Sequence, residues 1–361
     1  MRLAWLQLRD FRSYSALEWS PDPGVNILVG PNGAGKTNVL EAIGFLTNLR
    51  SFRGSPEEML VRDNADTAVV RGEESLGNTL VEVEISRKGG KRARIGQKPI
   101  GRSADMMTAL RTVAFLPDDL DLIKGSPAGR RDLLDDVATQ IWPASALDQA
   151  EFDRTLRQRN TYLKQGERDV ATLDVWDTRL AQAAGKVMAR RARAAMALEE
   201  TLVDSYGRIA GEETAVHFAY QSDWGGTLDP TTPTGEWVAN LTAALRDRRR
   251  LDLELRNTGS GPHRDDPAIS LDGRESRHQA SQGEQRTLAL AIRLATHRAV
   301  FHQTDRLPLL LLDDVYSELD PDRSKALTDA LPEAQTFVST TRLEEVPVPG
   351  RTWLVSEGSI R

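Results

Sequence analysis

The sequence has no cysteine among its 361 residues, which excludes a disulfide framework, a thiolate zinc site and a cysteine nucleophile. It also has no apolar run near the ~20 residues that a membrane span requires. The segment Met1-Arg2-Leu3-Ala4-Trp5 lacks the apolar core of a signal peptide. We therefore expect a cytoplasmic protein with no membrane partner. The chain also lacks a positive net charge. Its formal net charge is −6, so binding to nucleic acid would have to depend on local basic patches.

The length and composition of the chain are those of an ordinary globular protein. A chain of 361 residues is long enough for about two domains with a sizeable core. The hydrophobic fraction of 39% and the charged fraction of 28% are typical of soluble domains. Function must therefore be inferred from particular motifs.

A glycine-rich stretch near the N-terminus carries the clearest chemistry. The apolar run 25–29 leads into G-x-x-x-x-G-K-T, and a helical pattern follows it, which is the strand–loop–helix context of a P-loop. Glycines let backbone N–H groups point inward with no Cβ in the way of a phosphate, and the next helix adds its positive end. We predict that ATP is bound by Gly30, Pro31, Asn32, Gly33, Ala34, Gly35, Lys36, Thr37 and Asn38.

Two side chains of this loop have individual predicted roles. Lys36 is expected to lie in a solvated loop, to reach the β- and γ-phosphates and to act in catalysis. The Thr37 hydroxyl is expected to take one position on Mg²⁺. The alternative interpretation is a glycine-rich turn that binds nothing.

A second half of the site is predicted where a fully buried strand, Leu307-Pro308-Leu309-Leu310-Leu311-Leu312, ends in Asp313-Asp314. Ligands of open α/β sheets bind at the carboxyl ends of buried parallel strands. We predict that Asp313 holds Mg²⁺ through water and that Asp314 orients the attacking water. Many buried strands end in aspartate, so this pattern alone is weak evidence for a nucleotide site. It becomes strong evidence because the same chain contains a complete P-loop.

The segment Ser281-Gln282-Gly283-Glu284-Gln285 opens a long predicted helix. S-x-x-E is a capping box, which is a structural motif, and a helix N-terminus is also a site for anions. We predict both uses, with nucleotide contacts from Ser281, Gly283, Glu284 and Gln285.

The rest of the chain suggests three parts. Strand-like patterns occur at 3–8, 15–19, 69–70, 80–85, 268–271, 336–341 and 352–355. From about 118 to 255 helical patterns dominate. We predict an ATPase lobe with the P-loop over 1–117, a helical inserted lobe over 118–255, and an ATPase lobe with the signature motif and the acidic strand end over 256–361.

The inserted lobe is predicted to contain two antiparallel helices joined at 165–169. One is marked by Phe152, Leu156 and Leu163, and the other by an apolar face whose period breaks at Arg190-Arg191. Its arginines could follow phosphates or form a solvated helix face. They are Arg154, Arg157, Arg159, Arg190, Arg191, Arg193, Arg246, Arg248, Arg249 and Arg250.

A hairpin is predicted at Gly89-Gly90, within the segment Arg87-Lys88-Gly89-Gly90-Lys91-Arg92-Ala93-Arg94. The five basic side chains of this segment are equally consistent with two interpretations: a charged, solvated edge of a sheet, or a surface that faces DNA.

Taken together, the P-loop, the 281–285 signature, the Asp313-Asp314 strand end and Ser317-Glu318-Leu319-Asp320 resemble an ABC-type ATPase head of the SMC kind. Three further segments narrow the resemblance to the RecF family of bacterial recombination mediators. They are 8–14 (LRDFRSY), 125–135 (GSPAGRRDLLD) and 261–266 (GPHRDD).

This resemblance implies an α/β fold, an ABC-type P-loop ATPase head with a mostly helical inserted lobe. It implies ATP and Mg²⁺ as cofactors and an ATP-dependent, head-to-tail homodimer in which Ser281 reaches the ATP of the partner chain. It also implies binding to double-stranded DNA and single-strand/double-strand junctions. With RecO and RecR, such a protein helps to load RecA in DNA repair, replication restart and the SOS response.

Three departures from the ATPase pattern predict a slow switch. Thr340-Thr341 stand where many ABC ATPases have a histidine, the catalytic acid is Asp314 instead of glutamate, and 115–118 offers no Q-loop glutamine. The alternative functions are the ATPase subunit of a membrane transporter and a chromosome-bridging SMC-like protein. The helical insert and the 11–14 segment argue against the first, and the shortness of the inserted helices argues against the second.

Overall fold

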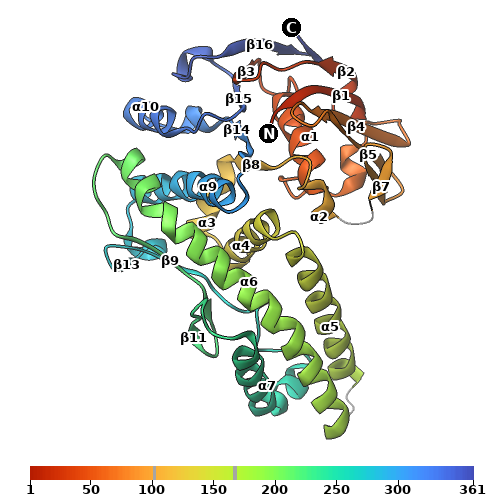
Figure 1. Ribbon diagram of the computed structural model, residues 1–361, viewed down its shortest axis with the longest axis vertical. Coiled ribbons are helices and arrows are strands. Elements are labelled where there is room, and N and C mark those ends of the chain that lie inside the picture. The colour runs from red at the N-terminus through yellow and green to blue at the C-terminus, as the bar shows by residue number, and fades with distance from the viewer. Residues whose placement is uncertain (101–102, 166–168) are drawn as a thin grey trace. The chain divides into compact units, whose positions relative to one another are not determined.

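The computed structural model describes residues 1–100, 103–165 and 169–361 (Figure 1). The chain forms two compact units. Unit 1 comprises Met1–Asp119, Ser205–Glu212 and Ala289–Arg361, and unit 2 comprises Leu120–Asp204 and Glu213–Leu288. The predicted turn at Gly166-Glu167-Arg168 lies outside the described residues. The division into an ATPase lobe, a helical inserted lobe and a second ATPase lobe stays a prediction. It assigns a role to each segment, and the two compact units do not test those roles.

Unit 1 contains a six-stranded sheet that carries the P-loop strand near its middle. Its strands are, in sheet order, β17 (Ser359–Ile360), β16 (Arg351–Ser356), β3 (Val25–Val29), β15 (Thr336–Thr340), β14 (Leu309–Asp313) and β8 (Thr112–Phe115). All neighbours pair in parallel except β17 with β16. Every residue of β14 and β15 is buried, as continuous apolar runs in a parallel sheet predict. The strand predicted at 25–29 is confirmed, and the strand predicted from Leu307 to the two acids is confirmed with its start at Leu309.

A second six-stranded sheet of unit 1 is antiparallel. Its strands are, in order, β2 (Tyr14–Trp19), β1 (Leu3–Phe11), β4 (Thr67–Glu74), β5 (Thr79–Ser86), β6 (Lys91–Ile95) and β7 (Lys98–Ile100). The predicted hairpin between β5 and β6 is confirmed, with both Gly89 and Gly90 at φ +89°, where glycine is favoured. Two of its basic side chains hold local structure: Lys91 Nζ donates to Glu57 and to the Leu49 carbonyl, and Arg87 donates to the carbonyls of Ala65 and Val61.

Helix α1 (Lys36–Asn48) lies between the two sheets (Figure 1). Most of its residues are buried, because it has a sheet on either side instead of one solvated face. Its Val39, Ile43 and Phe45 belong to one apolar cluster that includes Leu6 and Val70 from the antiparallel sheet and Leu311 and Phe337 from the parallel one. This core fixes the start of α1, and with it the P-loop, relative to both sheets.

Unit 2 is mostly helical. Its helices are α3 (Asp121–Lys124), α4 (Pro127–Ile141), α5 (Ser145–Gln165), most of α6 (Val170–Ala210), α7 (Thr234–Leu255), α8 (Ser276–Gln279) and the first turns of α9 (Gln282–Thr304). A small sheet has the order β13 (Arg274–Glu275), β12 (Ala268–Leu271) and β9 (Val216–Ala219), and β10 (Gln221–Ser222) pairs with β11 (Gly226–Thr227). Elsewhere the chain adds α2 (Ser103–Met106), α10 (Pro321–Ala330) and 3₁₀ helices at Glu57–Leu60, Pro117–Leu120, Val315–Glu318 and Leu343–Glu345.

The predicted antiparallel helix pair is formed by α5 and α6, which run side by side in Figure 1. Ion pairs join Asp148 to Arg190, Glu151 to Lys186 and Arg159 to Asp177, so residue numbers fall on α6 as they rise on α5. The apolar period breaks at Arg190-Arg191, but the helix continues beyond these residues to Ala210. Arg191 is buried and bonded to Asp135 Oδ1 and Oδ2, so a paired charge replaces an apolar side chain on the inner face.

Within the described residues, no helix combines the length and the hydropathy that crossing a membrane requires.

Candidate nucleotide-binding site

The P-loop occupies the gap between the end of β3 and the start of α1, as the motif predicts. Gly33 and Gly35 have φ of +80° and +106°, which L side chains rarely adopt. A Cβ on Gly30 would lie 2.3 Å from the carbonyl oxygen of Val355, and one on Gly35 would lie 2.9 Å from the Tyr14 hydroxyl oxygen. Close packing against Val355 and Tyr14 of the same chain therefore requires glycine at positions 30 and 35. This requirement is separate from any that a bound phosphate imposes.

The β1–β2 hairpin holds the loop from one side. The Tyr14 hydroxyl donates to the Gly35 carbonyl over 3.1 Å, and Asn38 Nδ2 donates to Ser13 Oγ over 2.9 Å. Burial raises the pKa of Tyr14, so its hydroxyl keeps its proton and stays a donor. Arg12 Nε and Nη2 donate to the two carboxylate oxygens of the buried Glu41 on α1, over 2.8 and 2.7 Å. These bonds tie the 11–14 segment to the P-loop helix.

Lys36 does not lie in a solvated loop, so that expectation was wrong. Its exposure is 7%, and its ammonium donates to the carbonyls of Gly30 and Pro31 over 2.8 and 3.0 Å. Burial lowers the pKa of Lys36, and the nearby Asp314 and Asp313 oppose that shift. The side chain thus folds back over the loop and faces the acidic end of β14.

The acidic end of β14 meets the P-loop through hydroxyl groups. Thr37 Oγ1 donates to Asp313 Oδ1 over 2.8 Å, and Ser339 Oγ on β15 donates to the same oxygen over 2.6 Å. Neither bond uses Oδ2. Because the Thr37 proton is directed to Asp313, the lone pairs of Oγ1 remain free to face a cation. The structure therefore brings together the two residues predicted to serve Mg²⁺.

Asp314 follows in an unusual backbone conformation, with φ +52° and ψ +26°. Left-handed φ is uncommon outside glycine, although aspartate tolerates it better than most residues. The Asp314 Oδ1 atom is buried and has no hydrogen-bond partner among the described residues. A buried carboxylate oxygen without a donor is costly, and such atoms are concentrated where a ligand completes the bonding.

The signature segment belongs to unit 2, and its capping box is confirmed. Ser281 N donates to Glu284 Oε2 over 2.6 Å, and Glu284 N donates to Ser281 Oγ over 3.3 Å. These bonds, with Arg274, hold the pKa of Glu284 below its usual value. Ser281 is exposed, whereas the Gln285 amide is buried and donates to the carbonyls of Ser276 and Arg277. Direct nucleotide contacts from Ser281, Gly283, Glu284 and Gln285 stay a prediction.

Comparison with known proteins decides the family. A family model described as "RecF/RecN/SMC N terminal domain" matches residues 2–348. The DNA replication and repair protein RecF of Frankia alni is 40% identical over 375 residues, covering 100% of this chain and 99% of that protein. The chain belongs to the RecF family.

Solved RecF structures have the same fold. The "recombination mediator protein RecF-ATPrS in RecFOR pathway" matches with a TM-score of 0.91 and 28% identity, over 99% of this chain and 97% of that one. The corresponding RecF-ATP structure matches with a TM-score of 0.89 and 28% identity, over 99% and 98%. The predicted fold class, an ABC-type ATPase head of the SMC kind with a mostly helical inserted lobe, is confirmed.

Two segments that carried the RecF resemblance, 125–135 and 261–266, are bonded to each other inside unit 2. Arg130 on α4 donates twice to Asp266 Oδ1, over 2.9 and 2.7 Å, and Arg131 donates to the Asp265 carbonyl over 2.7 Å. Arg191 on α6 joins both segments, because it bonds Asp135 and also donates to the Pro262 carbonyl over 2.6 Å. This association was not predicted from the sequence. The only signal for it was that each segment carries arginines and aspartates.

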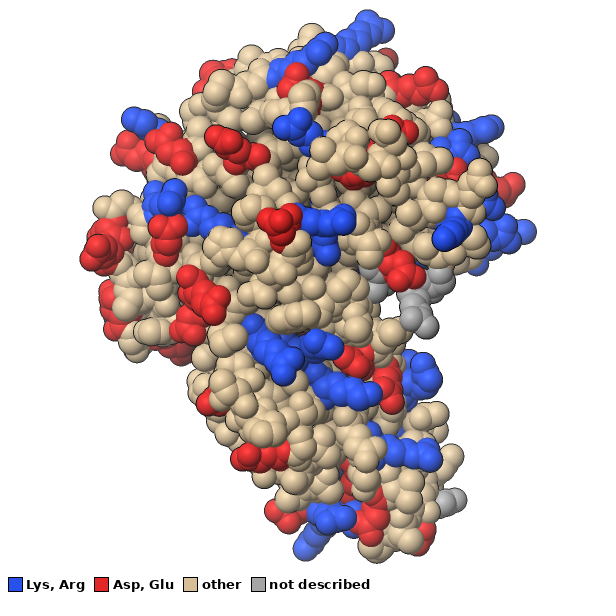
Figure 2. Space-filling model, in the orientation of Figure 1, with Lys and Arg blue, Asp and Glu red and all other residues tan. Residues whose placement is uncertain are grey.

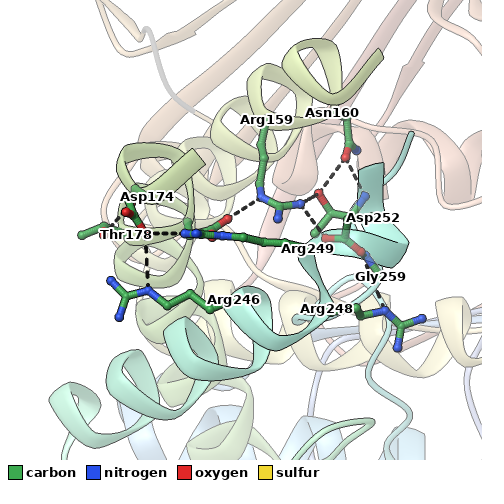
Figure 3. A network of polar contacts seen from close by, with 11 residues as sticks. Arg159, Asn160, Asp174, Thr178, Arg246, Arg248, Arg249, Asp252 and Gly259 are labelled. Atoms are coloured by element: carbon green, nitrogen blue, oxygen red, sulfur yellow. Dashed lines mark hydrogen bonds and ion pairs between the residues drawn. The ribbon is translucent and has the colours of Figure 1, made fainter. Parts of the chain in front are cut away.

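The arginines of the inserted lobe differ widely in burial and pairing, which neither sequence interpretation foresaw. Arg159 is fully buried and donates to Asp177, Asp252 and Thr258 over 2.7–2.9 Å (Figure 3). Arg249 bonds Asp177 and Asp174 in the same network. Arg159, Arg191 and Arg249 are therefore paired with acids of the lobe and are not placed to follow phosphates. Their positions on helices gave no sign of this, since the acids lie far along the chain.

Of the ten lobe arginines singled out in the sequence, five are exposed: Arg154, Arg157, Arg193, Arg246 and Arg250. Arg190 and Arg248 are partly buried and pair with Asp148 and Asp252. Figure 2 shows basic and acidic side chains interspersed on the visible face of the chain. That mixture agrees with the net charge of −6 and leaves the exposed arginines as the lobe's candidates for contacts with phosphates.

Proposed function

We propose that this RecF-family chain is an ATP-gated DNA-binding protein of recombinational repair and replication restart, with slow ATP hydrolysis as its reset. The observation that carries the proposal is the bond from Thr37 Oγ1 to Asp313 Oδ1, which unites a P-loop with the acidic end of a buried strand. The ATP named for the related RecF structure supports the choice of nucleotide.

The residues of the site fit ATP with Mg²⁺. Gly33 has a positive φ and open space where a Cβ would stand, so no side chain blocks the approach of a phosphate to the backbone N–H groups of the loop. Asp313 and Thr37 offer the oxygen ligands that Mg²⁺ prefers. ATP supplies the free energy of its hydrolysis when bound, and Mg²⁺ offsets the negative charge of its phosphates.

Each side chain then has a separate role. Lys36 exchanges the carbonyls of Gly30 and Pro31 for the β- and γ-phosphates. Thr37 and Asp313 hold the cation, Asp313 through water. Asp314 accepts a proton from the attacking water with its unpartnered Oδ1 and so orients that water. Asp314 is one methylene shorter than glutamate, and Thr340-Thr341 replace a histidine, so turnover is slow.

The nucleotide also joins two subunits. Ser281 of one chain binds the γ-phosphate held by Lys36 of the other, with Gly283, Glu284 and Gln285 shaping that helix N-terminus. Because ATP has more contacts in the dimer than in the monomer, it shifts the population toward the dimer by its differential affinity. The dimer binds double-stranded DNA next to single-strand gaps and junctions, and with RecR and RecO it helps to load RecA. We infer that the protein acts in the cytoplasm.

The test is sedimentation of the wild type and Lys36→Met with and without ATP and duplex DNA. The wild type should form an ATP-dependent dimer on DNA, and Lys36→Met should stay monomeric. Methionine fills similar space without the ammonium, so the variant should fold, with a cost of about 1–2 kcal/mol for the two lost bonds. If Lys36→Met dimerises with ATP at the wild-type concentration, the proposed use of the P-loop is wrong.

A further inference from the structure

Ser339 is a residue of unit 1 that belongs to none of the motifs recognised in the sequence. Ser339 lies on β15 directly opposite Asp313 in the parallel register of β14 and β15. It is 2% exposed, so its hydroxyl must find its partners within the protein.

The Ser339 hydroxyl is shared between the two acidic residues. Its oxygen lies 2.6 Å from Asp313 Oδ1 and 3.0 Å from the backbone N of Asp314. An ionised carboxylate only accepts and an N–H only donates, so the hydroxyl proton goes to Asp313 and a lone pair accepts from Asp314. One small side chain thus orients the carboxylate of one acid and the backbone of the next.

The hydrogen bonds of Ser339 constrain both Asp313 and Asp314. Asp313 Oδ1 receives hydroxyl protons from two different elements, from Thr37 on α1 and from Ser339 on β15, which restricts the rotation of the carboxylate. Asp314 is held in its left-handed conformation by bonds from its N–H to both Oγ and the carbonyl oxygen of Ser339, at 3.0 and 3.2 Å. A residue with positive φ persists where the surroundings over-determine it.

We propose that Ser339 is the positioning residue of the nucleotide site, which holds Asp313 in the orientation that serves Mg²⁺ and fixes the turn that presents Asp314. The inference rests on the proposed function, because it names a further residue of the same site. Ser339 itself does not contact nucleotide or metal. It acts through Asp313, in the way that outer-shell hydrogen bonds orient the ligands of a metal.

Thr336, on the same strand, provides a matched control. It is 1% exposed, and its Oγ1 donates to the Ala334 carbonyl over 3.0 Å, at the end of β15 away from the acids. Thr336→Val therefore removes a buried hydroxyl from β15 without touching Asp313 or Asp314.

The experiment titrates Mg²⁺ against the binding of a fluorescent ATP analogue to the full-length protein. We compare the wild type with Ser339→Ala, Ser339→Cys, Ser339→Thr and Thr336→Val, and record the thermal unfolding midpoint of each. Ser339→Ala and Ser339→Cys should raise the Mg²⁺ concentration at half-saturation about tenfold, within the 10–100-fold range of outer-shell variants. Binding without Mg²⁺ should be unchanged. Ser339→Thr keeps the hydroxyl and should restore the wild-type midpoint, and Thr336→Val should keep it.

The outcomes separate this inference from the proposed function. A wild-type Mg²⁺ midpoint in Ser339→Ala or Ser339→Cys, whatever the change in thermal stability, overturns the role of Ser339 and leaves the proposed function intact. Failure of Ser339→Thr to restore the midpoint also overturns it, because the hydroxyl would not be the group that matters. A wild-type protein that binds no ATP analogue overturns the proposed function, and the inference with it.

Discussion

The hydroxyl of Thr37 donates a hydrogen bond to Asp313 Oδ1 over 2.8 Å, although the two residues lie 276 positions apart in the chain. Thr37 is in the first turn of α1, and Asp313 is the last residue of β14. Only β15 separates β14 from the P-loop strand β3 in the sheet. The bond therefore joins two motifs from opposite ends of the sequence into one site.

Asp314→Asn should spare ATP binding and slow ATP cleavage by ~10²–10⁴-fold, the usual loss when a general base is removed. Asparagine keeps the size of the side chain but lacks the charge that orients the attacking water. Uncleaved ATP should then hold the dimer on DNA, so the variant should sediment as a persistent complex. Asp322→Asn, an exposed acid nearby, is the control. Cleavage at the wild-type rate in Asp314→Asn would remove Asp314 from the catalytic role.

Ser281→Arg should bind ATP as a monomer and hold DNA weakly. The bulky side chain at the start of α9 obstructs the partner's nucleotide, while the variant's own P-loop is unaltered. Loss of the cap costs about 0.5–2 kcal/mol, and Ser281→Ala loses the same cap without the bulk, so it controls for stability. The measurement is sedimentation with ATP and duplex DNA, combined with unfolding in urea.

The double variant, Ser281→Arg with Asp314→Asn, gives a stricter check of this prediction. It should behave like Ser281→Arg alone, since no dimer forms for slow cleavage to preserve. Normal dimerisation by Ser281→Arg would disprove the shared site even if every motif were correctly assigned.

DNA binding should depend on phosphate contacts from exposed arginines and show little preference for sequence. The logarithm of the binding constant should fall by about 0.9 per neutralised phosphate for each log unit of salt. Arg154→Gln with Arg157→Gln should reduce that slope, because both side chains are exposed on α5. Fluorescence anisotropy between about 50 and 200 mM salt measures it. Affinity that does not change over this range excludes the electrostatic interpretation.

Arg159→Met should destabilise unit 2 by about 3 kcal/mol, the lower end for breaking a buried ion pair. The substitution leaves Asp252 without its buried guanidinium, whereas Asp177 keeps its bond from Arg249. Arg154→Met, on the exposed face of the same helix, should change stability little. The free energy of unfolding in urea is the measurement, and equal effects of the two variants would contradict the structural role of Arg159.

Acid should destabilise the protein partly through His297. Burial lowers the pKa of His297 from 6.5 to about 4, and its Nε2 donates to the Pro308 carbonyl while the buried Nδ1 has no partner among the described residues. The unfolded chain binds a proton below pH 6.5, whereas the folded chain resists it until about pH 4. The stabilisation present at pH 7 is therefore lost as the pH falls through this window, by up to about 3 kcal/mol.

His297→Gln keeps a donor for the Pro308 carbonyl but does not titrate, so its stability should depend less on pH between 6.5 and 4 than that of the wild type. His302→Gln, on the exposed part of the same helix, should follow the wild-type curve. Unfolding in urea at several pH values measures the difference, and parallel curves for wild type and His297→Gln would refute the assignment.

The parts of the fold that could be predicted are those encoded within a few neighbouring residues. The strands at 25–29 and 268–271 and the capping box at Ser281 are confirmed at the predicted positions. The strand predicted from Leu307 begins two residues later, at Leu309. Short apolar runs, glycine at positive φ and S-x-x-E act locally, so no distant partner is needed to recognise them. The strand β8 and the helix α4 had no comparable local signal and were not predicted.

The sequence by itself therefore determined the P-loop, the acidic strand end, the capped helix and, through their combination, the family. Only the tertiary structure decided which polar residues work together. It buried Arg159 and Arg191 with acids while leaving Arg154 and Arg157 exposed, and it set Ser339 beside Asp313. The physical reason is that an ion pair or a shared hydroxyl depends on which segments become neighbours in space. The order of the strands and the register of the helices decide which segments are neighbours. The local sequence around a residue does not specify either of them.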